Sequence, residues 1–286
     1  MTRRPFRLLT PRQAQAIARV VLWAVLGATV ATLAFIILFV LRRGLAHVTW
    51  SFLTEAPRDS GRAGGIGPMI VGTLYVTLLG VAIATPLGVG TAIYLSEYTR
   101  AGKLTAIIRF GAECLASVES IIFGLFGFVL FVVTLGFGWS VLAGGLTIAF
   151  MILPTIIRTA EEAVRAVPRS YREVSCSLGA SPWQTIGRVV LPAALPGIVT
   201  GVILGFGRAI GDTAAVLFTA GSSLPAHAPH SLFDSTRTLS VHFYQLAREG
   251  ISADKAYATA SVLVLAVLTV NVSAYALMNR FLRRYR

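Results

Sequence analysis

Charged residues are scarce in this sequence. Only 13% of the 286 residues are Asp, Glu, Lys or Arg, whereas a soluble domain averages roughly 25%. Hydrophobic residues make up 55%, and the mean hydropathy is +0.75. This balance predicts a membrane protein that crosses the bilayer several times. The net charge of +13 is then better explained by membrane topology than by nucleic acid, so we expect no nucleic-acid partner.

Patterns for catalysis and metal binding are also missing from the sequence. The two cysteines, Cys114 and Cys176, fall in an expected span and in an expected polar segment, which predicts neither a disulfide nor a metal site. No Gly-x-x-x-x-Gly-Lys-Ser/Thr motif is present, since Gly102-Lys103 is followed by Leu104. We therefore expect no metal site, no cofactor and no ATP hydrolysis in this chain, which would not be an enzyme. The four histidines show no ligand spacing, and we interpret them as solvated residues of outer loops; they are His47, His227, His230 and His242.

Six stretches are apolar and long enough to cross about 30 Å of hydrocarbon, which takes about 20 residues. The spans are expected within residues 20–41, 63–96, 106–135, 140–157, 193–218 and 256–279. The basic start before the first run resembles a signal peptide, but the run is too long and shows no convincing cleavage site, so we interpret it as a retained anchor. The expected fold is all-α, with six transmembrane helices.

Arginine and lysine residues predict how these spans are oriented. The sequence divides into a basic N-terminus, a first span, an outer loop, a five-helix domain with a polar segment, and a basic tail; the ranges are 1–19, 20–41, 42–67, 68–279 (polar segment 161–192) and 280–286. Most Lys and Arg residues lie in the two termini, the 97–109 turn and the polar segment. The positive-inside rule therefore places both termini and the polar segment in the cytoplasm, and the 42–67 loop on the periplasmic side.

The polar segment carries signals for two short helices. Gly179 stands where a first helix would need a left-handed C-terminal residue, and Ser181 with Gln184 fits a capping box before Pro182. Such an amphipathic pair could dock in a partner's groove or lie on lipid headgroups with Trp183 at the membrane surface, and the residues alone leave both open. A DNA-reading helix-turn-helix is excluded because both ends are tied to spans.

One motif in this segment resembles the permease subunits of bacterial ABC importers. Glu173-Val174-Ser175, then Gly179, then Val189-Val190-Leu191-Pro192 reproduce the spacing of that family's Glu-Ala-Ala motif. In the family, this element is a pair of coupling helices that sits in a groove of the ATPase subunit. The resemblance implies a type I ABC importer permease-like fold. It also implies a set of ATPase-coupling residues: Glu173, Ser175, Gly179, Trp183, Leu191 and Pro192.

Further stretches are similar to the phosphate-specific permeases of this family, and to the A-type subunit. They are residues 64–74, 86–98, 208–214, 232–244 and 256–260. The resemblance implies import of inorganic phosphate across the bacterial cytoplasmic (inner) membrane by alternating access. The implied partners are a C-type permease subunit, an ATPase dimer that binds ATP, a periplasmic phosphate-binding protein and membrane lipid. Asp212 and Glu119 depart from the pattern, which more often has Glu and Pro there.

Arg208 and Asp212 are the candidate substrate-binding residues. Helical rise places Arg208 near mid-bilayer, where its guanidinium must face protein or water and would match an oxyanion. Asp212, four residues on, would hold the guanidinium in the empty state. The alternative is a permanent Arg208–Asp212 or Arg208–Glu119 pair that only locks helices together. The residues leave these equal, and the resemblance favours substrate binding.

Two other functions stay open at this point. The chain could carry another oxyanion, such as sulfate or molybdate, since an arginine fork suits all of them. It could also be a proton-coupled carrier or channel independent of ATP, with Glu113, Glu119 and Asp212 as relay groups. We expect Glu113 and Glu119 to be protonated or paired, because bare carboxylates in hydrocarbon are costly.

Overall fold

The computed structural model describes residues 10–99, 102–225 and 227–284, and it is helical apart from one small hairpin. Among these residues, five helices are long and apolar enough to cross a membrane, and there are six candidate spans if one bent pair counts as a single span. The expected all-α membrane fold is confirmed. Some of the basic residues that carried the topology prediction lie outside the described residues: Arg3, Arg4, Arg7, Arg100 and Arg286.

The elements follow one another along the chain as a series of long helices joined by short ones. In order they are α1 (Pro11–Gly44), η1 (Leu45–His47), α2 (Trp50–Thr54), β1 (Pro57–Arg58), η2 (Asp59–Gly61), β2 (Ala63–Gly64), α3 (Gly67–Ile93), η3 (Tyr94–Tyr98), α4 (Lys103–Ala116), α5 (Ser120–Gly127), η4 (Phe128–Thr134), α6 (Val141–Ala166), α7 (Arg169–Ser177), α8 (Pro182–Thr185), η5 (Ile186–Val190), α9 (Leu191–Gly211), α10 (Ala214–Thr219), α11 (Leu239–Arg248) and α12 (Ala253–Arg284). Strands β1 and β2 are antiparallel, with Pro57 opposite Gly64.

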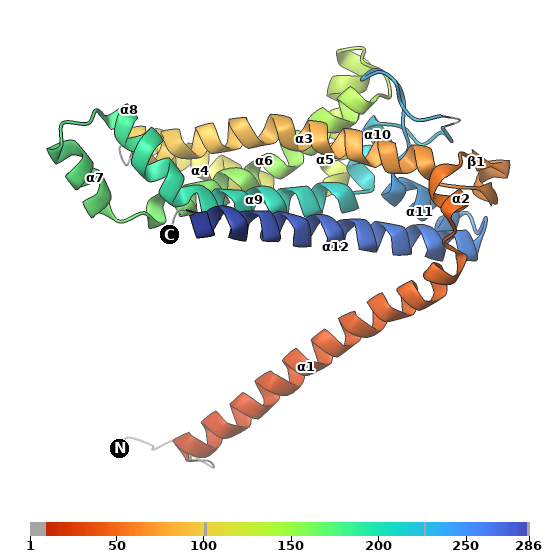
Figure 1. Ribbon diagram of the computed structural model, residues 1–286, viewed down its shortest axis with the longest axis horizontal. Helices are drawn as coiled ribbons and strands as arrows, with labels where there is room; N and C mark the ends of the chain where they lie inside the picture. The colour runs from red at the N-terminus through yellow and green to blue at the C-terminus, as the bar shows by residue number, and fades with distance from the viewer. Residues whose placement is uncertain (1–9, 100–101, 226, 285–286) are drawn as a thin grey trace, which may run out of the picture.

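The bundle is built around α6, which contacts α3 on one side and α9 on another (Figure 1). Glycines allow α3 to approach α6 closely: a Cβ atom added at Gly80 would lie 2.7 Å from Ile148 Cγ2. Small residues at helix contacts are typical of membrane bundles. The main core is made of fully or nearly fully buried apolar side chains, among them Val76, Ala84, Phe123, Ile148, Met151, Ile152, Ile156, Ala215 and Val216.

Helix α1 leaves the bundle and touches it near one end only (Figure 1). At that joint, Ser261 Oγ of α12 donates a hydrogen bond of 3.1 Å to the Val40 carbonyl oxygen. The Arg43 guanidinium lies 5.2 and 5.5 Å from the ring centroids of Phe39 and Tyr257. None of the apolar window that marks α1 as a span is buried within this chain.

The third span differs from the expected continuous helix over residues 106–135. Helices α4 and α5 meet at an angle of 101°, so the span is broken near its middle. The break follows from local hydrogen bonding: Ser117 Oγ donates to the Cys114 carbonyl at 2.7 Å, and Glu119 has extended backbone angles as the N-cap of α5. Both Glu113 and Glu119 are consequently exposed at the surface of this chain.

The fourth and fifth spans begin or end at residues other than those expected. Helix α6 continues past residue 157 to Ala166 and takes Glu161 out of the polar segment. The fifth helical run starts earlier, because α8, η5 and α9 form one candidate span from Pro182 to Gly211. It ends before residue 218, since Asp212 is extended (φ −72°, ψ 130°). The polar segment is therefore shorter than predicted.

Two expected loops contain structure. The 42–67 segment holds α2 and the β1–β2 hairpin, and the 221–255 segment holds α11. Helix α11 is amphipathic, and its apolar face, including Leu239 and Leu246, is buried. The interpretation of all four histidines as solvated is therefore wrong for His242, which is only 2% exposed, whereas the other three are exposed.

Candidate substrate and coupling sites

The predicted helix pair of the polar segment is present as α7 and α8. Gly179 has φ +81°, the left-handed conformation that glycine adopts without strain. The capping box is complete: the Gln184 amide donates to Ser181 Oγ at 3.3 Å, and the Ser181 amide donates to Gln184 Oε1 at 2.9 Å. Pro182 is the first residue of α8. The local sequence therefore fixes this turn as predicted.

The helix pair has an inner polar contact and an outer apolar face. Ser175 and Thr185 are buried, and their hydroxyl oxygens lie 2.9 Å apart between the two helices. Ser175 therefore holds α7 to α8 and does not point outward. The outer face carries Val174, Leu178 and Trp183, whose exposed fractions are 60%, 83% and 71%. An exposed apolar row of this kind is suited to a partner's groove.

The remaining motif residues lie in different surroundings. Glu173 is exposed, and the structure records no ion pair for it among the described residues. Leu191 is half-buried and packs against a cluster that includes Val164 and Val190, whereas Pro192 is exposed at the start of α9. Leu191 thus joins the fifth span to α6, and the motif residues do not form one surface.

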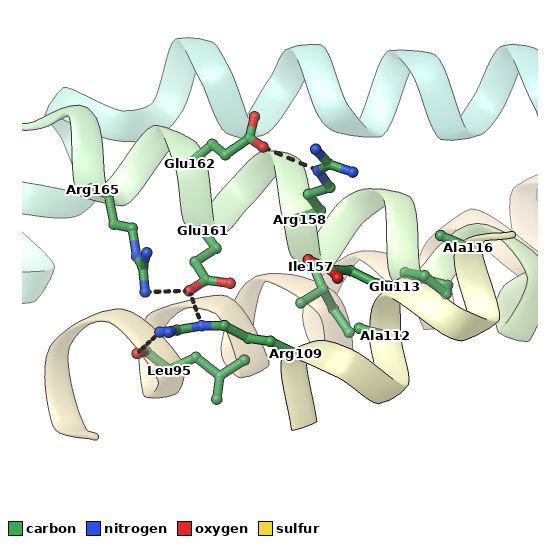
Figure 2. A pocket seen from close by; sticks show the side chains of 11 residues that line it. Leu95, Arg109, Ala112, Glu113, Ala116, Ile157, Arg158, Glu161, Glu162 and Arg165 are labelled. Carbon is green, nitrogen blue, oxygen red and sulfur yellow. Dashed lines mark hydrogen bonds and ion pairs between the residues drawn. The ribbon is translucent and has the colours of Figure 1, made fainter. Parts of the chain in front are cut away.

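Charged residues that the sequence analysis did not select gather near α7. The Arg172 side chain of α7 contacts Glu97 of η3, with 2.6 Å between Nη2 and Oε1. Between α4 and α6, Arg109 Nε lies 2.8 Å from Glu161 Oε1, and Arg165 Nη2 reaches the same oxygen at 2.8 Å (Figure 2). Arg172 and Glu97 are 75 residues apart, and Arg109 and Glu161 are 52 apart, so no local spacing pattern could have paired them; Arg165 and Glu161 are a local pair on α6.

A cavity of about 190 Å³ opens between α4 and α6 beside these ion pairs (Figure 2). Its wall carries three arginines and three glutamates, namely Arg109, Arg158, Arg165, Glu113, Glu161 and Glu162. Arg158 pairs with Glu162 one turn along α6 at 3.1 Å. Because the charges of the wall balance, the cavity has no net preference for an anion or a cation.

Arg208 lies in the last turn of α9, close to where the helix ends. It is exposed, and within the described part of the chain no carboxylate oxygen lies within 4.0 Å of its guanidinium. The expected contacts with Asp212 and Glu119 are therefore absent from this conformation. A cation at a helix C-terminus is stabilised by the helix dipole, which favours an arginine at this position.

Asp212 shapes the break after α9. Its Oδ1 accepts a hydrogen bond of 2.9 Å from the Ala215 amide, and its carbonyl oxygen accepts one of 2.8 Å from Ser240 Oγ of α11. The carboxylate also accepts a hydrogen bond from the side chain of Ser120, the first residue of α5. The two helix breaks, between α4 and α5 and between α9 and α10, therefore meet at Asp212.

A second polar group is buried at the α11 end of the bundle. Arg237 is 6% exposed, and it donates from Nε to the Ser222 carbonyl at 2.7 Å and contacts it again through Nη2. Its Nη1 lies 3.3 Å from His242 Nδ1. Burial, and then the charge of Arg237, lower the pKa of His242 to about 4; burial lowers the pKa of Arg237 to about 10. At neutral pH, Arg237 is therefore charged and His242 is neutral.

These features define a class: a multi-span membrane subunit with broken helices and a two-helix element at the start of its fifth span, without the nucleotide motif of an ATPase. Residues 84–286 match the family model of the binding-protein-dependent transport system inner membrane component, and the chain belongs to this family. It is thus a multi-pass inner-membrane permease subunit of an ABC importer. It is a transport subunit and not an enzyme, and ATP is handled by a separate ATPase subunit.

The similarity to individual proteins extends over most of the chain. A probable ABC transporter permease protein of Bacillus subtilis, YqgI, is 34% identical over 250 residues, which are 82% of this chain and 85% of that protein. The phosphate transport system permease protein PstA 1 of Mycobacterium tuberculosis is 38% identical over 195 residues, 67% of this chain and 64% of that one. A chain of a bacterial alginate ABC transporter, crystallised with an alginate pentasaccharide-bound periplasmic protein, superimposes with a TM-score of 0.66 at 16% identity. That superposition covers 94% of this chain and 98% of the other.

Proposed function

We propose that this subunit carries inorganic phosphate into the cell, with Arg208 and Asp212 in the substrate path. The observation that supports this most directly is the state of Arg208: an exposed guanidinium at the end of α9, without a carboxylate partner within the described residues. A guanidinium offers its donors in a planar fork that matches two oxygens of a phosphate. The relative from M. tuberculosis, named as a phosphate transport permease, supports the same substrate.

Asp212 has a different task in this proposal from that of Arg208. Its carboxylate binds the Ala215 amide and the Ser120 side chain. It therefore fixes the ends of α9, α10 and α5 relative to one another at the two helix breaks. Discontinuous helices line substrate sites in many transporters, because their free backbone ends can face a polar solute. Asp212 then fixes the site beside the anion, and Arg208 binds it.

The outer face of α7 and α8 is the proposed contact with the ATPase. Trp183 and Leu178 would fill the groove of one subunit of an ATPase dimer, with Glu173 and Gly179 at its edge. Helix α9 follows α8 through η5, so a push on this face reaches Arg208 along one helical run. Loss of the apolar side chains, as in Leu178→Ser with Trp183→Ser, is expected to release the ATPase from the membrane.

The same proposal assigns the orientation of the subunit in the membrane and the surfaces that face its other partners. The described ends of α1 and α12 point toward the side where α7 and α8 lie (Figure 1), so we assign this side and both termini to the cytoplasm. The hairpin and α11 then face a periplasmic phosphate-binding protein. The apolar residues exposed on α4 and α5, such as Phe110 and Ile122, are left for lipid and a second, C-type permease subunit.

Uptake of labelled phosphate into vesicles that hold the complete transporter tests this function. Arg208→Gln should lower uptake by more than about tenfold, since a charged hydrogen bond contributes roughly 1.5 to 3 kcal/mol. The matched control is Arg42→Gln, which changes another exposed arginine in the last turn of a helix, on α1, and should leave uptake unchanged. Unlabelled sulfate and molybdate serve as competitors. Equal competition by either anion would contradict the phosphate assignment, and normal uptake by Arg208→Gln would contradict the assignment of Arg208 to the substrate site.

A further inference from the structure

The contact between α7 and the helix bundle is made mainly by the Arg172 side chain, and less by apolar packing. Helix α7 packs on α8 and η5, which belong to its own two-helix element. Arg172 reaches across to Glu97, a residue 75 positions away at the end of the second span. Its Nε lies 3.2 and 3.1 Å from the two carboxylate oxygens, and its Nη2 lies 2.6 Å from Oε1. The fork of the guanidinium therefore holds both oxygens of Glu97.

The same guanidinium also closes the end of α6. Nη1 donates to the Val167 carbonyl at 2.8 Å, and Nη2 donates to the Val164 carbonyl at 3.0 Å. The last carbonyls of a helix have no partner within the helix, so a side chain that binds them is held firmly. The Arg172 and Glu97 side chains are only 22% and 12% exposed, which limits screening by water. Arg172 thus joins α7, η3 and the end of α6 at one point.

A second ion pair continues this connection to α4. Arg109 Nη2 donates to the Leu95 carbonyl of η3 at 3.3 Å, while its Nε binds Glu161 of α6 (Figure 2). The side chain of Leu95 is buried, and Leu95 lies two residues before Glu97, so both arginines hold η3. The cavity between α4 and α6 lies beside this pair. Side-chain packing leaves that space unfilled, and beside it the Arg109–Glu161 pair holds α4 against α6.

We propose that the pairs Arg172–Glu97 and Arg109–Glu161 make α7, η3, α4 and the end of α6 move as one body. When the ATPase displaces α7, this body carries α4 with it and turns it at the break after Ser117, next to the substrate path. Arg172 and Glu97 are then positioning residues for coupling. This inference rests on the proposed contact of α7 and α8 with the ATPase, but it does not depend on which anion is carried.

The chain's two cysteines provide the measurement. Cys114 on α4 and Cys176 on α7 are both exposed and are the only cysteines of the sequence, so each can take a spin label without other substitutions in this chain. The complete transporter, with its partner subunits free of cysteine, is reconstituted in lipid. The distance between the labels is then recorded without nucleotide and with ATP. We expect the same narrow distribution in both states for the unchanged protein.

Loss of the Arg172 or the Glu97 charge should allow the two spin labels to move relative to each other. Arg172→Gln and Glu97→Gln should each broaden the distribution and make it depend on ATP. The control is Arg158→Gln, which breaks an exposed pair at the same cavity and should change nothing. If Arg172→Gln reduces assembly of the transporter, the same distances are measured in Arg172→Lys. This variant keeps the charge and loses only the planar fork of hydrogen-bond donors.

Two outcomes would overturn the inference. One is a label distance that changes with ATP in the unchanged protein, and the other is an identical distribution in Arg172→Gln and the unchanged protein. Phosphate carried per ATP hydrolysed should also fall, by roughly tenfold, in Arg172→Gln. If Arg208→Gln transports phosphate normally while the labels behave as expected, the assignment of Arg208 to the substrate site fails and the inference about α7 stands.

Discussion

The hydroxyl oxygens of Ser175 and Thr185 lie 2.9 Å apart in the buried contact between α7 and α8. This hydrogen bond fixes the angle between two helices that are otherwise joined by a turn of a few residues. The angle decides whether Leu178 and Trp183 present one face to a partner. Ser175, which the family resemblance implies for ATPase coupling, therefore lies inside the element and not on its outer face.

Ser175→Ala should weaken this angle. Loss of one buried hydrogen bond costs about 1 kcal/mol, with a larger cost if Thr185 is left without a partner. We expect the subunit to assemble and the phosphate carried per ATP hydrolysed to fall severalfold. Ser177→Ala is the control, because that hydroxyl is exposed and donates only to the Glu173 carbonyl in its own helix. Equal effects of the two variants would show that the contact has no role in coupling.

Gly179→Val should uncouple ATP hydrolysis from transport. Gly179 has φ +81°, and nothing lies within 4 Å of an added Cβ, so the cost comes from the backbone alone. A left-handed conformation costs a residue with a Cβ roughly 1 to 2 kcal/mol, so the turn between α7 and α8 would rearrange. Gly187→Val, at an open position without positive φ in η5, is the matched control. Both variants should reach the membrane in normal amounts, and unchanged coupling in Gly179→Val would refute the prediction.

The stability of the folded subunit should depend on pH through His242. Its pKa of about 4 in the folded protein lies below the ordinary value of 6.5, so the unfolded chain binds the proton more readily between these values. The free energy of unfolding should therefore fall as the pH drops through this range, by up to about 3 kcal/mol at roughly 1.4 kcal/mol per pH unit.

Thermal unfolding of the purified transporter at several pH values measures this effect. His242→Gln should remove most of the slope below about pH 6.5, and His230→Gln, at an exposed histidine, should leave it unchanged. A slope that persists in His242→Gln would assign the pH dependence to other groups.

Close packing between α3 and α6 predicts a strong effect of a larger residue at Gly80. An added Cβ would lie 2.7 Å from Ile148 Cγ2 and 3.1 Å from the Gly145 carbonyl oxygen, so the helices must separate. Overpacking of this kind costs about 1 to 3 kcal/mol. Gly80→Val should lower the unfolding temperature, whereas Gly90→Val, at an open position of the same helix, should not. A similar decrease for both would point to helix propensity as the cause.

The sequence was most informative where structure depends on neighbouring residues. The capping box of Ser181 and Gln184 and the left-handed Gly179 are local patterns, and both were predicted correctly. The number of spans also follows from local hydropathy. The bend after Ser117 does not, because a hydropathy window over residues 106–135 is apolar whether the helix is straight or broken.

Contacts between residues far apart in the chain could not be predicted from the sequence. Arg172 and Glu97 are 75 residues apart, and Arg109 and Glu161 are 52 apart, so no periodicity links them. Burial of His242 was missed for the same reason, since the segment around it is amphipathic and its apolar face becomes buried only when α11 packs on the bundle. The pairing expected for Arg208 and Asp212 assumed a helix that continues, whereas α9 ends at Gly211.

The separation of α1 from the bundle has a thermodynamic consequence. Because its apolar window is not buried within this chain, α1 gains its stability from the bilayer and from its own backbone hydrogen bonds. The bundle gains its stability from side-chain packing around α6. The subunit therefore consists of two folding units joined near Gly44. Heat or denaturant can disrupt the bundle while α1 stays helical in the membrane, so far-ultraviolet circular dichroism will show helix after the bundle has unfolded.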